Sequence, residues 1–176
     1  MSFAEKKIKS KVVYDGKILR LEVDDVELPD GNPAHRECVR HSGGAAVLFV
    51  KDGKIALVKQ FRYLYGEEIY EIPAGKLNCG EDPLIAASRE LEEETGYKAN
   101  SIKNLLDIYP SPGYTDEIIH IFYTDDARFV GQKLDDGEFL AVDYVEIDKV
   151  VKMIESGKIK DAKTVAAVYK YLYINK

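Results

Sequence analysis

The 176-residue chain has few residues of the kinds that build disulfide frameworks, zinc sites or membrane spans. Its two cysteines, Cys38 and Cys79, are far apart and form no Cys-x-x-Cys pair, so we expect neither a zinc site nor a disulfide. No apolar run approaches the roughly 20 residues that a membrane helix needs. Residues 1–7 are charged where a secretory signal would turn apolar. We therefore expect a cytoplasmic protein with no membrane partner.

The chain also has fewer basic than acidic residues. The chain has 25 Lys and Arg against 31 Asp and Glu, which gives a formal net charge of -6 and a pI near 5.2. Such a balance argues against a surface that neutralises a nucleic-acid backbone. The lysine cluster at 6–11 is short, and we interpret it as a solvated edge. We expect no nucleic-acid partner, and an anionic substrate would need local positive charge.

The first part of the chain is rich in hairpin signals. Asp-Gly pairs, which tolerate positive φ, lie between strand-like runs at 15–16, 30–31 and 52–53. The apolar runs 45–50 and 55–58 predict strands buried on both faces of a central sheet. The hairpins before them could form a separate small sheet. Such a sheet buries too little area to be stable alone and would pack on the main domain or on a partner subunit.

A helix is predicted from Pro83 to Thr95. Asp82 suits the N-cap, proline suits the first helical position, and Gly96 suits the residue just past the end. We expect its apolar stripe to be Leu84, Ala87 and Leu91.

The remaining elements are strand-like segments followed by helices. The segments are 102–109, 118–123 and 139–147, and the helices are near 148–156 and 161–173. With 45% hydrophobic residues the chain can bury a real core. This order predicts an α/β fold with a mixed central sheet covered by helices on both faces.

The segment from Gly75 to Tyr97 carries the chemistry. It runs Gly75, five residues, Glu81, seven residues, Arg89-Glu90-Leu91, then Glu92, Glu93-Glu94, Thr95 and Gly96-Tyr97. An acidic run on a helix is usually a solvated face. Here nine positions are specified across 23 residues, and a chance match at any start is on the order of one in a billion. The full pattern therefore outweighs the solvated-face interpretation.

The spacing of three glutamates predicts a metal-binding helix face. Glu90, Glu93 and Glu94 lie at i, i+3 and i+4, so their carboxylates crowd together on one side of the helix. A divalent cation removes that repulsion, and Mg²⁺ prefers oxygen ligands from carboxylates, water and phosphate. Glu92 is about 200° around the helix from Glu90 and should face solvent.

Two further residues of the segment support this face. Glu81, on the loop that enters the helix, can bring another carboxylate toward the same metal cluster, and Gly75 permits the backbone bend there. Arg89 adjoins Glu90 and precedes Glu93 by one turn. Its fixed charge can orient a metal-binding carboxylate, and we do not expect it to act as a base.

With these residues the chain resembles the Nudix hydrolases, and within them the ADP-ribose pyrophosphatase branch. The branch resemblance depends on Ser111-Pro112-Gly113-Tyr114-Thr115-Asp116-Glu117, in which Pro112 lies 16 residues beyond Gly96. The stretches 58–63 and 71–75 resemble the same branch, and the likeness extends to residues 161–164.

The resemblance implies a Nudix-type α/β/α sandwich preceded by a small N-terminal antiparallel β subdomain. We place the subdomain at residues 1–42 and the hydrolase domain at 43–176. It also implies Mg²⁺-dependent hydrolysis of ADP-ribose to AMP and ribose 5-phosphate, with Mn²⁺ able to substitute. The implied metal ligands are Glu90, Glu94 and the Ala74 carbonyl, assisted by Glu93 and Glu81.

The implied catalytic set comprises Glu93, Glu94, the supporting Arg89 and one acid from a late loop. The matching stretch, 134–139, offers Asp135, Asp136 and Glu138. We favour Glu138, with the other two as open alternatives.

Substrate contacts are implied at five positions. Arg62 can bind phosphate oxygens bidentately at the end of a core strand, or it pairs with a nearby acid. Arg36 resembles a family position that reaches substrate across a dimer, and the family encloses the adenine with partner-subunit residues, which implies a homodimer. Pro112, Gly113 and Tyr114 complete the set.

Two other functions remain open at this stage. A Nudix hydrolase of this type could act on another nucleoside diphosphate sugar, such as GDP-mannose, or on an oxidised nucleotide. A catalytically silent Nudix domain that senses a nucleotide belongs to a different class. The intact carboxylates argue against it, and the acidic 176-residue chain leaves no obvious room for a DNA-binding domain.

Overall fold

The computed structural model describes residues 2–176, which form two compact units. The first unit is Met1–Gly43 together with Tyr109–Ile118, and the second is Gly44–Ile108 together with Ile119–Lys176. The division of the sequence near residue 42 left 109–118 in the second unit, whereas this stretch folds with the first. Segments that are distant in the sequence pair to form the first unit, so a single boundary in the sequence cannot describe it.

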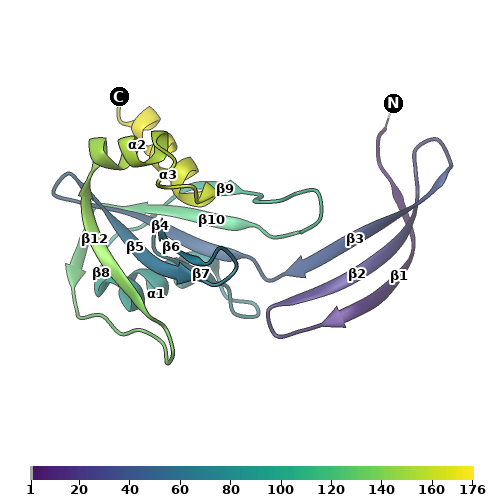
Figure 1. Cartoon of the computed structure of the whole chain (residues 1–176), viewed down its shortest axis with the longest axis horizontal. Helices are drawn as coiled ribbons and strands as arrows, with labels where there is room; N and C mark the ends of the chain where they lie inside the picture. Colours follow the sequence, from purple (N-terminus) through teal and green to yellow (C-terminus); the bar gives the residue numbers. More distant parts are fainter. Residues whose placement is uncertain (1) are drawn as a thin grey trace. The chain divides into compact units, whose positions relative to one another are not determined.

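Three antiparallel strands, in the order β1-β2-β3, form the sheet of the first unit (Figure 1). Their bounds are β1 Lys6–Asp15, β2 Leu19–Glu27 and β3 Pro33–His41. Between β2 and β3 the expected turn is present, since Gly31 has a φ of 86° and its N–H donates to the Leu28 carbonyl at 2.9 Å. Every residue of β1 is exposed, so this sheet has little core of its own.

The stretch Tyr109–Ile118 attaches to the edge of β3. Val39 N–H donates to the Tyr114 carbonyl at 2.7 Å, and Asp116 N–H donates to the Val39 carbonyl at 3.2 Å. The Asp116 carboxylate also accepts from His41 N–H at 2.9 Å. These bonds pair backbone donors and acceptors along the edge of β3.

The second unit is built on a mixed sheet of seven strands. Its order is β12-β5-β4-β10-β9, with β6 paired to β5 and β7 paired to β4. β10 runs parallel to β4, and the other pairs are antiparallel. A separate pair joins β8 to β11. The bounds are β4 Gly44–Lys51, β5 Lys54–Arg62, β6 Glu67–Glu71, β7 Ala74–Lys76, β8 Tyr97–Ala99, β9 Lys103–Ile108, β10 Ile119–Thr124, β11 Ala127–Phe129 and β12 Leu140–Glu146.

Helices cover both faces of this sheet, as Figure 1 shows. They are α1 Pro83–Thr95, α2 Ile147–Glu155 and α3 Ala162–Ile174. Alternate residues of β4 point to opposite faces. Leu48 packs in the cluster that includes Val150 of α2 and Val168 of α3, whereas Val47 packs with Leu91 of α1. The α/β/α sandwich is therefore confirmed, and its central strand is buried on both sides.

Helix α1 has the bounds and caps that its sequence predicts. The Asp82 carboxylate accepts from Leu84 N–H at 2.8 Å, and Gly96 ends the helix in the left-handed region with a φ of 74°. The predicted apolar stripe is wrong at Leu84, which is 43% exposed. Ala86 is buried instead, beside Ala87 and Leu91. Within residues 2–176, no helix is long and apolar enough to cross a lipid bilayer.

Candidate active site

Three carboxylates around α1 gather on the guanidinium of Arg89. Its Nη1 donates to Glu90 at 2.7 Å and to Glu93 at 2.9 Å, while its Nε and Nη2 donate to Glu81 at 3.1 and 3.2 Å. The bonds to Glu81, followed by the charge of Glu90, raise the pKa of Arg89 further above its ordinary value. One permanent positive charge thus orients three acids at once.

Glu94 is the buried member of the acidic face, with only 3% of its surface exposed. Its Oε2 accepts from the backbone N–H of Ala74 at 2.9 Å, which joins α1 to the start of β7. Burial raises the pKa of Glu94 to about 8, and the charges of Glu90 and Glu138 add to the rise. Burial and the neighbouring carboxylates thus both disfavour the charged form of Glu94.

The absence of a side chain at Gly75 allows the Glu90 carboxylate to lie against the backbone of Gly75. A Cβ at position 75 would overlap the Glu90 carboxylate, so only glycine lets this side chain lie there. Burial raises the pKa of Glu90, and the charges of Glu93 and Glu138 raise it further against the opposing effect of Arg89. The close approach brings a carboxylate next to the backbone of Ala74 and Gly75.

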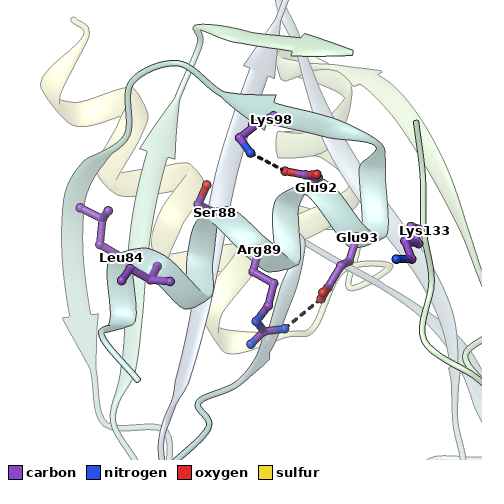
Figure 2. Close-up of a pocket in the computed structure, with 8 residues that line it drawn as sticks. Leu84, Ser88, Arg89, Glu92, Glu93, Lys98 and Lys133 are labelled. Atoms are coloured by element: carbon purple, nitrogen blue, oxygen red, sulfur yellow. Dashed lines mark hydrogen bonds and ion pairs between the residues drawn. The ribbon is translucent and has the colours of Figure 1, made fainter. Parts of the chain in front are cut away.

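Glu92 lies apart from this cluster. Its side chain pairs with Lys98 at 3.4 Å and is 39% exposed. Figure 2 shows Glu92 directed toward Lys98, on a different side of the helix from the Arg89–Glu93 pair. Its orientation agrees with the helical geometry, which placed Glu92 away from Glu90.

A polar groove of about 510 Å³ is lined by Glu90 of the acidic face and by the late loop. Its wall includes Gln60 and Arg62 from β5, residues 74–76 of β7, Asn78, Arg89, Glu90, and the late-loop residues 135–138. Of the three late-loop acids, Glu138 is half-buried, whereas Asp135 and Asp136 are exposed. The charge of Glu138 is also the one that raises the pKa of both Glu90 and Glu94.

Residues 22–168 match the family model described as the NUDIX domain, which spans most of the chain. The chain belongs to the Nudix family. The segment from Gly75 to Tyr97 is its Nudix box, and α1 is its Nudix helix.

Several known proteins are similar to this Nudix chain over almost their whole length. It is 46% identical over 170 residues to an ADP-ribose pyrophosphatase of Bacillus subtilis (strain 168), covering 95% of this chain and 92% of the relative. It is 43% identical over 172 residues to a methanol dehydrogenase activator of Bacillus methanolicus, covering 94% and 91%. A solved structure described as an ADP compounds hydrolase aligns with a TM-score of 0.86 at 22% identity, covering 98% and 95%. That structure supports the fold.

The oxygen donors of the Nudix site fit a hard divalent cation. The Ala74 carbonyl, Glu90 and Glu94 are the residues that would hold it, and a bound cation would favour the charged form of the two carboxylates, which burial disfavours. Among residues 2–176, no three acidic, histidine or cysteine side chains already surround one point. Arg89 holds the carboxylates of Glu81 and Glu93 by hydrogen bonds.

Arg62 pairs with an acid, which was one of the two roles that the sequence left open for it. Its Nε and Nη2 donate to the two carboxylate oxygens of Glu71 at 2.5 and 3.0 Å. The same guanidinium lies in the groove wall with Glu90. A guanidinium carries five N–H donors, so pairing with Glu71 leaves capacity for phosphate oxygens. Sequence reasoning missed Glu71, although it begins the 71–75 stretch.

The other predicted substrate residues belong to the first unit. A groove there is lined by Arg36, Pro112, Gly113 and Tyr114, which come from β3 and from the attached stretch 109–118. The Arg36 guanidinium donates to Glu5 at 2.5 Å and to the His35 carbonyl at 2.9 Å. Tyr114 is 58% exposed. These four residues, chosen only by resemblance, are thus gathered in one place.

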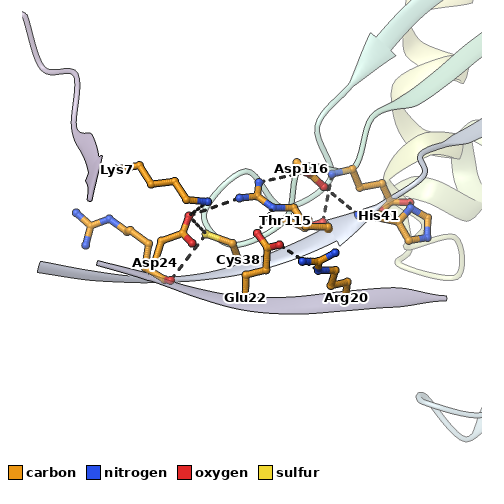
Figure 3. Close-up of polar contacts among 11 residues, drawn as sticks. Lys7, Arg20, Glu22, Asp24, Cys38, His41, Thr115 and Asp116 are labelled. Carbon is orange, nitrogen blue, oxygen red and sulfur yellow. Dashed lines mark hydrogen bonds and ion pairs between the residues drawn. The ribbon is translucent and has the colours of Figure 1, made fainter. Parts of the chain in front are cut away.

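A polar network that includes Arg40, a residue of the groove lining, joins the strands of this unit (Figure 3). Asp24 is buried and pairs with Lys7 at 2.9 Å and with Arg40 at 3.6 Å, while Arg40 also contacts Glu22 at 2.9 Å. A hydrogen bond from Ser10, followed by the bond from Lys7, lowers the pKa of Asp24. The network ties the strands of the first unit together, which compensates in part for its small apolar core.

Proposed function

We propose that this chain hydrolyses ADP-ribose to AMP and ribose 5-phosphate with Mg²⁺ as the cofactor. The observation that carries the proposal is the groove of the second unit, where Glu90 and Glu138 line a wall shared with the Ala74 backbone, and buried Glu94 bonds to Ala74. The ADP-ribose pyrophosphatase relative, at 46% identity, supports this substrate.

In this proposal the charged residues of the Nudix box, together with Ala74 just before it, have two roles, metal binding and orientation of the ligands. Glu90, Glu94 and the Ala74 carbonyl hold the metal, and Glu81 and Glu93 assist. Bound Mg²⁺ neutralises diphosphate oxygens and lowers the pKa of a coordinated water. Arg89, through the four bonds described above, sets the orientation of the acids and takes no proton.

Glu138 is the residue that we assign as general base. Its carboxylate accepts a proton from the attacking water as the new P–O bond forms and the bridging P–O bond breaks. All three late-loop acids line the groove, but the partial burial of Glu138 and its electrostatic effect on Glu90 and Glu94 support this role over Asp135 and Asp136. The Arg62 guanidinium, oriented by Glu71, binds a phosphate oxygen of the substrate.

A product screen tests the substrate. Purified protein is incubated with ADP-ribose, GDP-mannose, other nucleoside diphosphate sugars and dinucleotides, each with Mg²⁺, with Mn²⁺ or with EDTA. We expect AMP and ribose 5-phosphate from ADP-ribose in both metals and no release in EDTA. Rapid cleavage of GDP-mannose, with no AMP released from ADP-ribose, would mean that GDP-mannose is the substrate instead. Tight ADP-ribose binding without turnover would instead favour a nucleotide sensor.

We also propose that the first unit mediates a homodimer and contributes to the substrate site, with Arg36, Pro112, Gly113 and Tyr114 as its contacts. Its three-stranded sheet has an entirely exposed first strand and so lacks the buried hydrophobic face that independent stability needs. It exposes apolar side chains, among them Ile8 (58%) and Val12 (41%). Clustered apolar exposure of this kind marks an interface, and a second copy of the same sheet would cover it.

Light scattering after size-exclusion chromatography tests the dimer. The wild type should have about twice the 19.8 kDa chain mass. A variant with Ile8→Lys and Val12→Lys should shift to the monomer mass. Leu64→Lys, in the second unit at a position 91% exposed, is the matched control and should stay dimeric. A wild type of monomer mass at all concentrations would refute this part of the proposal.

A further inference from the structure

A buried ion-pair network lies outside the Nudix box. Lys163, in the first turn of α3, bonds to the Glu71 carboxylate and, at 3.0 Å, to Asp161, the N-cap of α3. Glu71 also receives the two bonds from Arg62. Glu71 is 4% exposed and Lys163 is 9% exposed. Lysine is almost never this buried unless it is paired, so the network requires an explanation beyond surface charge.

The network balances two positive charges with two negative ones. Burial raises the pKa of Glu71, but the hydrogen bonds and charges of Arg62 and Lys163 outweigh it, and the net shift is downward. Glu71 therefore stays ionised at neutral pH. Removing Lys163 alone would leave Glu71 and Asp161 facing only Arg62, an uncompensated charge in a buried site.

The same network reaches the catalytic groove by two routes. Through Glu71 it holds the Arg62 guanidinium, which is in the groove wall with Glu90. Through Thr164, whose Oγ1 accepts from Ile72 N–H at 2.9 Å, it holds the backbone just before Ala74. Thr164 is fully buried and its hydroxyl donates to Asp161. The start of α3 thus braces the segment that precedes the Nudix box.

We propose that Lys163 is a positioning residue that acts through Glu71 to orient Arg62 toward the substrate diphosphate. The inference rests on the proposed function, because Arg62 is taken there as a phosphate contact. Lys163 gives Glu71 a second cation, and Glu71 then offers both of its oxygens to one edge of the Arg62 guanidinium. The remaining N–H groups of Arg62 are then already oriented before the substrate binds. Less of the substrate's binding free energy is spent on ordering this side chain.

A double-mutant cycle tests this coupling. Lys163→Met should lower kcat/KM for ADP-ribose by roughly 10–100-fold, the range typical for supporting residues of this kind. In an Arg62→Ala, Glu71→Gln background, which leaves no buried carboxylate at position 71 without a cation, the same change should cost less than about twofold, because its target is absent. Lys160→Met, at an exposed lysine paired with Glu67, is the matched control and should keep wild-type activity. Lys163→Arg should recover part of the loss.

A second variant separates positioning from folding. Glu71→Gln with Lys163→Met removes one charge of each sign, so the fold should recover while kcat/KM stays near that of Arg62→Ala. Recovery of wild-type activity together with thermal stability would overturn the proposal, as would an equal effect of Lys163→Met in both backgrounds. The cycle is repeated on the Kd of ADP-ribose in EDTA. If wild type shows no turnover, the proposed function fails, and the Kd cycle still decides the role of Lys163.

Discussion

Glu94→Gln should reduce kcat for ADP-ribose hydrolysis by about a thousandfold, or roughly 4 kcal/mol of transition-state stabilisation. The amide keeps the size of the side chain and can still accept the Ala74 N–H. It cannot supply the anionic ligand that the metal requires. AMP release under saturating substrate and Mg²⁺ gives kcat.

The metal-free Glu94→Gln protein should be at least as stable as the wild type. Glu94 is 3% exposed, and burial raises the pKa of its carboxyl to about 8. A pKa raised in the folded state makes folding less favourable at neutral pH, and an amide that keeps the Ala74 hydrogen bond removes this penalty. Thermal unfolding in EDTA measures this difference. Added Mg²⁺ should raise the Tm of the wild type but not of the variant, since only a ligand that binds the native state stabilises it.

Glu92→Gln is the matched control for this experiment. It makes the same chemical change on the same helix at a side chain that is 39% exposed and pairs with Lys98. Its kcat should stay within about twofold of the wild type, since exposed pairs of this kind contribute little. Near-normal activity of Glu94→Gln would overturn the metal assignment, and so would a loss of activity that follows a lower Tm in EDTA.

Glu138→Gln should cost about 10²–10⁴-fold in kcat, the range for loss of a general base. The half-buried carboxylate of Glu138 lies in the groove wall, and its charge acts on both Glu90 and Glu94. Asp135→Asn and Asp136→Asn, on the same loop, should each cost less than about tenfold because their side chains are exposed.

Binding measurements distinguish a base from a residue that only attracts the cation. The Kd of Mn²⁺ should change less than kcat in Glu138→Gln, because the variant keeps Glu90 and Glu94. A drop in Mn²⁺ affinity as large as the drop in kcat would assign Glu138 to metal binding. A greater loss of kcat in either aspartate variant would move the base to that position.

Much of the second unit follows from local sequence rules. The N-cap, the first-position proline and the terminal glycine delimit α1, and the spacing of Glu90, Glu93 and Glu94 places three acids on one side of it. Leu84 is the exception in this helix. Its burial depends on the tertiary neighbours of α1, and the helical pattern alone does not determine them. The grouping of Tyr109–Ile118 with the first unit is a similar case.

Sequence by itself determined the family, the gathering of Glu90, Glu93 and Glu94 on one side of α1 and the different orientation of Glu92, since these depend on residues within a few helical turns. Only the tertiary structure decided which partners the charged groups have. Arg62 is held by Glu71, and Glu71 by Lys163, which is 92 positions away in the chain. It also brought Glu138 into the same groove wall as Glu90 in the Nudix box. Local patterns specify which side chains a segment presents, whereas burial and charge balance depend on segments that meet only when the chain folds.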